Sequence, residues 1–228
     1  MKTNKFVLFM MFALFTACVN NQKNSSEYNT QQNEKLTDAE FYQKVSDIIE
    51  QDWKKNKADE NTELKKSADD RTISETYLSN ENKDEMPIMG MPEYNLDTVY
   101  YSDFDKDGKT DALVNVGYTF GFSSLGVMDL YYLFLNTNNG FDYIYKFDNA
   151  ELALQVISKN GDDYPGRFEL QKIDGNKLTG SAIYYPQYGI ANFVVDTVEK
   201  LDFTYNKETR RFELSYSSDY VKMERVQV

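Results

Sequence analysis

Residues 99–114 read VYYSDFDKDGKTDALV, and this stretch decides the fold. Tyrosine and aliphatic residues stand at both of its ends, and such residues are typical of β-strands. The residues between them, 103–111, are polar and include Gly108, a residue type that interrupts strands and favours turns. The stretch therefore predicts two antiparallel strands joined by an aspartate-rich turn.

The same texture continues outward from this turn. From residue 94 onward, short runs rich in Tyr, Val, Phe, Ile and Leu alternate with Gly, Asn and Asp. No alternation of strands with helices is visible, which argues against a parallel α/β fold. We predict an antiparallel β domain over residues 94–228, a meander that is sandwich-like or like part of a propeller. The expected strands are 98–102, 112–119, 127–135, 141–147, 153–158, 167–172, 177–185, 193–205 and 211–216.

One helix is expected before the β domain, within residues 36–93. Residues 37–40, TDAE, form a capping-box pattern. Behind it, Phe41, Val45 and Ile49 follow helical spacing, which predicts an amphipathic helix over residues 38–55. Residues 54–85 are mostly charged, so we expect a poorly packed helix or a mobile linker there. The predicted fold class is thus mainly β with one N-terminal amphipathic helix.

Residues 1–17 have the pattern of an export signal. Two lysines precede ten apolar residues, 6–15, which are too few to span a bilayer as a helix, since that takes about 20 residues. Residues 15–18, FTAC, resemble the lipobox of bacterial lipoproteins, although Phe15 stands where that motif usually has leucine. The resemblance implies that Cys18 is lipidated and becomes the first mature residue. An ordinary secretory signal with an incidental cysteine is the alternative.

The lipobox resemblance also implies a location for the protein. Residues 18–35 are polar and non-periodic, as expected of a flexible tether. Val19 follows the cysteine in place of the aspartate that retains such lipoproteins at the inner membrane. We therefore expect an exported protein anchored in the cell envelope through Cys18, at the outer membrane.

Composition excludes several kinds of function. The 228 residues contain no histidine, which excludes a Ser-His-Asp triad and a His-ligated zinc site. With one cysteine, the chain cannot form an internal disulfide. A formal net charge of −12 argues against a nucleic-acid partner. No catalytic residue and no organic cofactor is predicted, and the balance leans away from an enzyme.

The turn in residues 103–111 has the pattern DxDxDGxxD and predicts a calcium site. Its acids match positions 1, 3, 5 and 9 of an EF-hand loop, and Gly108 matches position 6. Val114 replaces the closing glutamate and no helices flank the loop, which excludes a complete EF-hand. A solvated Asp-Gly turn is the alternative. The predicted ligands are Asp103, Asp105, Asp107, Asp111 and the carbonyl oxygen of Lys109.

Electrostatic repulsion favours the calcium interpretation. Two carboxylates about 4 Å apart repel each other by about 4 kcal/mol at an effective dielectric constant near 20. Four acids on one turn are therefore costly unless a cation neutralises them. Carboxylate and carbonyl oxygens are hard ligands, which suit Ca²⁺ better than softer metals.

Residues 103–114, together with the later stretch 132–141, YLFLNTNNGF, resemble an FG-GAP/VCBS-type repeat. The resemblance spans about residues 99–145. It implies that the loop aspartates bind Ca²⁺ and connect adjacent strands of a sheet. The chain has one copy of the pattern, and a propeller needs several blades.

One further feature bears on partners. Tyr184, Tyr185 and Tyr188 gather around a turn and could form an aromatic platform for a glycan or a protein partner. Alternatively, these tyrosines are simply common strand residues.

The sequence favours a binding or structural envelope lipoprotein with a calcium-stabilised hairpin. The alternatives are a carboxylate-dependent glycan-acting enzyme and an inhibitor or accessory subunit of an envelope complex.

Overall fold

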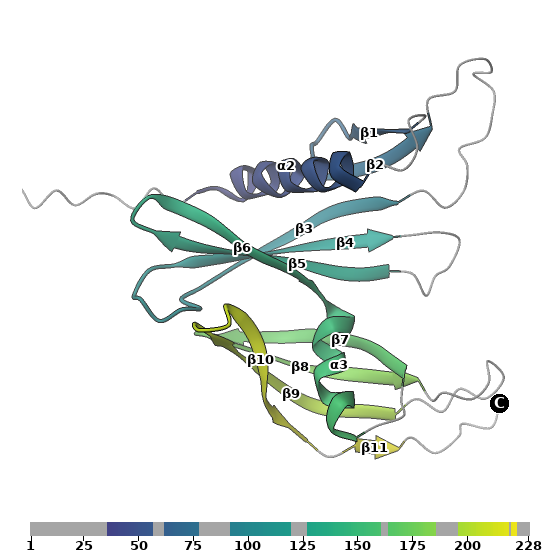
Figure 1. The fold of residues 1–228 in the computed structure, drawn as a ribbon, viewed down its shortest axis with the longest axis vertical. Helices are drawn as coiled ribbons and strands as arrows, with labels where there is room; N and C mark the ends of the chain where they lie inside the picture. Colours follow the sequence, from purple (N-terminus) through teal and green to yellow (C-terminus); the bar gives the residue numbers. More distant parts are fainter. Residues whose placement is uncertain are drawn as a thin grey trace, which may run out of the picture. The chain divides into compact units, whose positions relative to one another are not determined.

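The computed structural model describes residues 36–56, 62–77, 92–119, 127–160, 164–185, 196–218 and 220–222. The predicted signal (1–17), the predicted lipidation site Cys18 and the predicted tether (18–35) lie outside these residues. The elements within them are α2 (Asp38–Asn56), β1 (Thr62–Lys66), β2 (Thr72–Tyr77), β3 (Glu93–Ser102), β4 (Asp111–Thr119), β5 (Val127–Thr137), β6 (Gly140–Asp148), α3 (Asn149–Asn160), β7 (Tyr164–Asp174), β8 (Lys177–Tyr185), β9 (Asp196–Asn206), β10 (Arg211–Ser217) and β11 (Tyr220–Lys222) (Figure 1).

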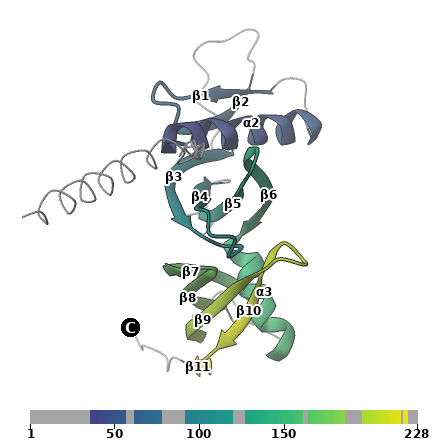
Figure 2. The same cartoon turned by 90° about the vertical axis from the view of Figure 1, so that its left-hand side faces the viewer.

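The strands form two antiparallel sheets. The first sheet has the order β1-β2-β3-β4-β5-β6, so each strand pairs with its neighbour in sequence. The second has the order β10-β9-β8-β7, and β11 pairs with β9. Helix α2 lies along the first sheet, on the side away from the second (Figures 1 and 2). The predicted fold class, mainly β and antiparallel with an N-terminal helix, is confirmed.

Helix α2 begins at the predicted capping box. The Glu40 carboxylate accepts hydrogen bonds from the Thr37 backbone N–H, at 2.7 Å, and from the Thr37 hydroxyl, at 2.9 Å. These bonds satisfy a donor that the first helical turn leaves unpaired. The hydrogen bond from the Thr37 backbone holds the pKa of Glu40 below its ordinary value. Phe41, Val45 and Ile49 are buried and turn the apolar face of the helix onto the first sheet.

The first sheet is covered on both faces because its central strands are apolar on both sides. Residues of β4 alternate between two buried clusters: Leu113 belongs to the cluster shared with the second sheet, and Val114 to the cluster under α2. Tyr131 and Tyr132 of β5 divide in the same way. The period of two along a strand sends consecutive side chains to opposite faces. The clusters therefore share β4 and β5.

The prediction of a strand over residues 153–158 is wrong, because this segment lies in helix α3. Leu152, Ala153 and Val156 are buried, and their spacing of one, three and four residues fits one helical face. Asp148 caps the helix by accepting a hydrogen bond from the Glu151 backbone N–H at 2.6 Å. A short apolar run cannot distinguish a strand from a buried helix by itself.

The charged segment after α2 also differs from the prediction of a helix or linker. Its residues 62–66 and 72–77 form the hairpin β1–β2, and β2 pairs with β3 through Thr72–Asn95 and neighbouring residues. Ile73 is buried in the cluster under α2. Pairing with β3 gives the backbone of β2 its hydrogen-bond partners, and the charge of the segment does not predict this pairing.

The edge strand β10 is covered by polar side chains. Gln155 of α3 donates a hydrogen bond to the Phe212 carbonyl at 3.0 Å and accepts one from the Leu214 N–H at 2.8 Å. The Tyr145 hydroxyl accepts a hydrogen bond from the Phe212 N–H at 2.8 Å. These contacts occupy backbone groups through which an exposed edge would pair with another chain.

No helix in the described part of the chain is long and apolar enough to cross a bilayer.

Candidate metal centre

The aspartate loop connects β3 and β4, the two strands that the sequence places on either side of it. The pair Ser102–Asp111 closes the ladder at the base of the loop. Gly108 has a φ of 87° and Lys106 a φ of 57°, so the backbone turns through the left-handed region twice. Glycine adopts that region at no steric cost, which explains Gly108 at the sixth position of the pattern.

Three of the predicted ligands converge. Asp103, Asp105 and Asp111 each offer one carboxylate oxygen, and these three oxygens lie within 4.8 Å of one another. Asp103 and Asp105 are partly exposed and Asp111 is buried. This donor set consists of hard, negatively charged oxygens, which fits Ca²⁺ by ligand type.

Asp111 also holds the loop backbone. Its Oδ2 atom accepts hydrogen bonds from the backbone N–H of Phe104 at 2.8 Å and of Asp105 at 3.4 Å. Its Oδ1 atom accepts one from the Asn136 N–H at 2.8 Å, which ties the loop to the end of β5. Burial raises the pKa of Asp111 to about 6, although these three hydrogen bonds lower it.

The carboxylates of Asp103 and Asp105 turn inward toward the loop backbone. Asp103 accepts hydrogen bonds from the N–H groups of Asp107 and Gly108, both at 3.0 Å. Asp105 accepts a second hydrogen bond from the Asp107 N–H at 3.0 Å. These backbone donors keep two carboxylates on the inside of the turn, where a cation would be held.

The other two predicted ligands, Asp107 and Lys109, pair with each other. Asp107 stands outside the converging group, and its Oδ1 atom accepts a hydrogen bond from the Lys109 N–H at 2.8 Å. The Lys109 ammonium lies 3.3 Å from Asp107 Oδ2 and donates to Asn138 Oδ1 at 3.0 Å. The Lys109 backbone hydrogen bond is the main cause that lowers the pKa of Asp107. Asp107 is thus paired with an ammonium in this loop.

Phe104 anchors the loop, a role that the sequence pattern did not predict. It stands between two of the converging aspartates, is fully buried, and packs edge-to-face on Phe212 of the second sheet, with 5.5 Å between ring centroids. The Ser102 hydroxyl donates to the Gly175 carbonyl, in the turn between β7 and β8, at 2.7 Å. The signal for this anchor was a single aromatic residue within an otherwise polar turn.

Asn136 is a second residue whose role was not predicted. Besides its backbone bond to Asp111, its side-chain amide donates to the Thr110 carbonyl at 3.2 Å. Asn136 is 8% exposed, so both groups are shielded from water. The residue lies within the stretch 132–141 that carries the resemblance to FG-GAP/VCBS repeats, which was the available signal.

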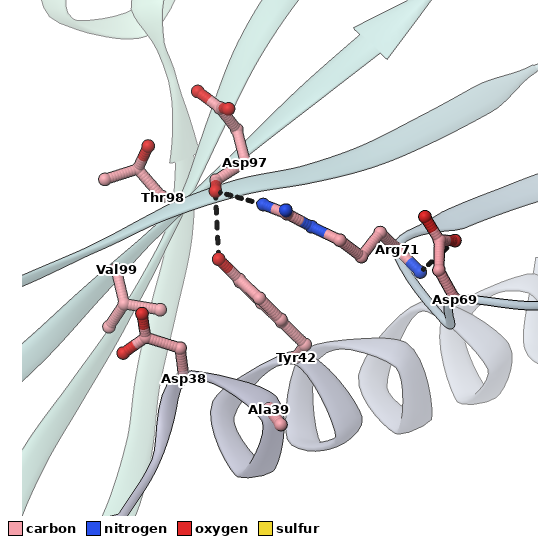
Figure 3. Close-up of a pocket in the computed structure, with 8 residues that line it drawn as sticks. All are labelled: Asp38, Ala39, Tyr42, Asp69, Arg71, Asp97, Thr98 and Val99. Atoms are coloured by element: carbon pink, nitrogen blue, oxygen red, sulfur yellow. Dashed lines mark hydrogen bonds between the residues drawn. The ribbon is translucent and has the colours of Figure 1, made fainter.

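A pocket of about 410 Å³ lies between the first turn of α2, the β1–β2 turn and β3. Figure 3 shows that the Tyr42 hydroxyl and the Arg71 guanidinium converge on the backbone carbonyl of Asp97, with bonds of 2.9 and 2.8 Å. Asp97 lies where the β3–β4 register shifts, so its carbonyl is available to side chains. We infer that these two hydrogen bonds stabilise the β-bulge at Asp97.

The predicted aromatic platform lies mainly outside the described residues. Tyr184 and Tyr185 end β8 but their side chains are not described, and Tyr188 follows in a segment that is not described.

The chain matched no family model, no curated protein and no solved structure with which it was compared.

Proposed function

We propose that this chain is a binding or structural lipoprotein of the bacterial cell envelope, anchored through Cys18, whose first β-hairpin loop is stabilised by Ca²⁺. The observation that carries the calcium part is the convergence of carboxylate oxygens of Asp103, Asp105 and Asp111 within 4.8 Å. Such a group of negative charges is costly without a cation. The anchor part depends on the sequence of residues 1–18.

The position of the loop gives calcium a structural effect. Phe104 lies in the cluster shared by the two sheets, and Asp111 bonds to the backbone at the end of β5. A cation that neutralises the loop would therefore stabilise contacts of both sheets. By ligand count, the affinity expected of such an extracellular module is about 10⁻⁴ to 10⁻³ M.

The calcium proposal is tested by thermal unfolding of the chain from residue 19 onward. Calcium should raise the melting temperature, and a chelator should reverse the increase. Asp105→Ala should abolish most of the effect, because it removes one of the three converging carboxylate oxygens together with its charge. The matched control is Asp142→Asn, which neutralises an exposed aspartate of β6 and should leave the calcium effect unchanged. A wild-type protein indifferent to calcium would refute the proposal.

The anchor is tested separately in cells that express the full chain. Labelled palmitate should be incorporated into the wild type but not into Cys18→Ser. The wild type should fractionate with membranes, because several acyl chains together hold a protein firmly there. Release of the wild type as an unlabelled soluble protein would support the alternative of an ordinary secretory signal.

A further inference from the structure

The side chain of Lys109 is held between the aspartate loop and the neighbouring hairpin. Its ammonium lies 3.3 Å from Asp107 Oδ2 and donates a hydrogen bond to Asn138 Oδ1 at 3.0 Å. Asn138 belongs to the turn between β5 and β6, so the two partners come from different hairpins of the first sheet. These contacts give the Lys109 charge a defined place at the loop.

Asp107 differs from the other acids of the loop in the kind of donor that it binds. Among the described residues, the three converging aspartates accept hydrogen bonds from backbone N–H groups alone. Asp107 accepts one from the Lys109 N–H and also pairs with the Lys109 ammonium. That backbone hydrogen bond is the main cause that lowers the pKa of Asp107, and the charges of Lys109 and Lys207 lower it further. The Asp107 carboxylate is therefore ionised and already has a cation as its partner.

The ion pair between Lys109 and Asp107 is partly shielded from water. The two side chains are 26% and 30% exposed. In the other ion pairs between described residues, the basic side chain is at least 40% exposed. Salt screens partly buried charges much less than exposed ones. The charge of Lys109 should therefore act on the acids of the loop and on a cation that they hold.

A calcium ion in the loop would compete with this ammonium. The pattern DxDxDGxxD predicts Asp107 as a ligand, but its carboxylate stands outside the converging group and lies against Lys109. Withdrawal of Asp107 from the ammonium costs their mutual attraction, and the ammonium repels a divalent cation placed nearby. Both effects lower the calcium affinity of the loop. The same ammonium neutralises one of the four acids when no metal is bound.

We propose that Lys109 is a built-in counter-ion of the aspartate loop, which lowers its calcium affinity and stabilises its metal-free form. This inference rests on the proposed function, because it concerns the same calcium site. A lower affinity shifts the change between the metal-free and the calcium-bound loop to higher calcium concentrations. That shift agrees with the range of about 10⁻⁴ to 10⁻³ M expected of an extracellular module.

The test compares Lys109→Gln with Lys106→Gln in the chain from residue 19 onward. Lys106 is exposed on the same loop, so each variant removes one positive charge and leaves the backbone carbonyl groups in place. Calcium chloride is titrated in, and the NMR signal of the Gly108 backbone amide gives the dissociation constant. Lys109→Gln should bind calcium about threefold more tightly or better. Lys106→Gln should change the affinity by less than about twofold, because exposed charges are screened.

A double substitution isolates the contact with Asp107. In an Asp107→Asn background, Lys109→Gln should raise the calcium affinity no more than Lys106→Gln does, because the carboxylate that holds the ammonium is gone. A difference between the two lysine variants that persists in this background would overturn the assigned pairing.

Thermal unfolding in chelator adds a measurement that needs no bound metal. Lys109→Gln should melt at a lower temperature than Lys106→Gln, since it leaves Asp107 without its cation. Saturating calcium should remove this difference, because the metal then neutralises the loop. Equal melting temperatures in chelator would contradict a stabilising role of Lys109 in the metal-free loop.

The outcomes distinguish this inference from the proposed function. Calcium binding by the wild type with equal affinity gains in both lysine variants would overturn the inference alone. Weaker binding by Lys109→Gln would also overturn it, and would assign Lys109 to positioning the loop through Asn138. A wild type that binds no calcium would refute the proposed function and this inference with it.

Discussion

At the scale of single residues, the aspartates of the loop divide into two kinds. Asp111 is fully buried and accepts three backbone hydrogen bonds, so it holds the loop shape with or without a cation. Asp103 and Asp105 are partly exposed, and their carboxylates converge with that of Asp111. Asp103 and Asp105 also accept backbone hydrogen bonds, but these come from Asp107 and Gly108 on the partly exposed side of the loop.

Substitutions should separate these roles. Asp111→Ala leaves three backbone N–H groups without their acceptor, and each unsatisfied buried donor costs about 1–3 kcal/mol. We expect a loss of about 3 kcal/mol or more in the free energy of unfolding even in chelator. Asp105→Asn should change that free energy by less than about 1 kcal/mol in chelator. Urea unfolding measures both, and equal losses in the two variants would contradict the division of roles.

At the scale of elements, most strands were predictable and the exceptions have physical causes. The segments around 112–119 and 177–185 were predicted almost as observed, because β-branched and aromatic residues there are bounded by turn residues. Helix α3 was predicted as a strand, since its apolar run is short. Strands β1 and β2 were missed because β1 pairs with β2 and β2 with β3 through backbone hydrogen bonds, and Ile73 is the apolar residue of this hairpin buried in the cluster under α2.

The packing of β7 against β8 makes a prediction about glycine. A Cβ atom at Gly180 would lie 2.1 Å from the Glu169 carbonyl oxygen and 2.7 Å from the Phe168 ring. Gly180→Ala should therefore lower the free energy of unfolding by about 3 kcal/mol or more, as expected of steric overlap in a core. Gly117→Ala is the matched control, with no contact closer than 3.9 Å and an expected change within about 1 kcal/mol. Similar melting temperatures for the two variants would contradict this packing.

At the scale of the whole described domain, adjacent tyrosines of β5 connect its two cores. Tyr131 is buried in the cluster between the sheets, and Tyr132 in the cluster under α2. Burial raises the pKa of both phenols above the ordinary value of 10.0. Loss of either core should expose β5 to water, so we expect both to unfold together.

Alkaline pH tests this coupling. A raised pKa means that the folded state binds the phenolic proton more tightly than the unfolded state does. The corresponding stability is fully present below pH about 10 and is lost as the pH rises above that value. The tyrosinate absorbance of the buried phenols should therefore appear together with the loss of circular dichroism, in one cooperative transition above pH about 10. Ionisation of all 18 tyrosines without loss of circular dichroism would contradict the prediction.

The sequence by itself determined the class of fold, the helix over residues 38–55 and the position of the aspartate loop. These depend on local patterns: the capping box, alternating strand residues, and a glycine in a sharp turn. Only the tertiary structure decided which acids converge, because Asp111 reaches the others through strand pairing and Asp107 turns to Lys109. The same holds for Phe104 and Gln155, since their partners lie on elements distant in sequence, whose proximity local patterns do not encode.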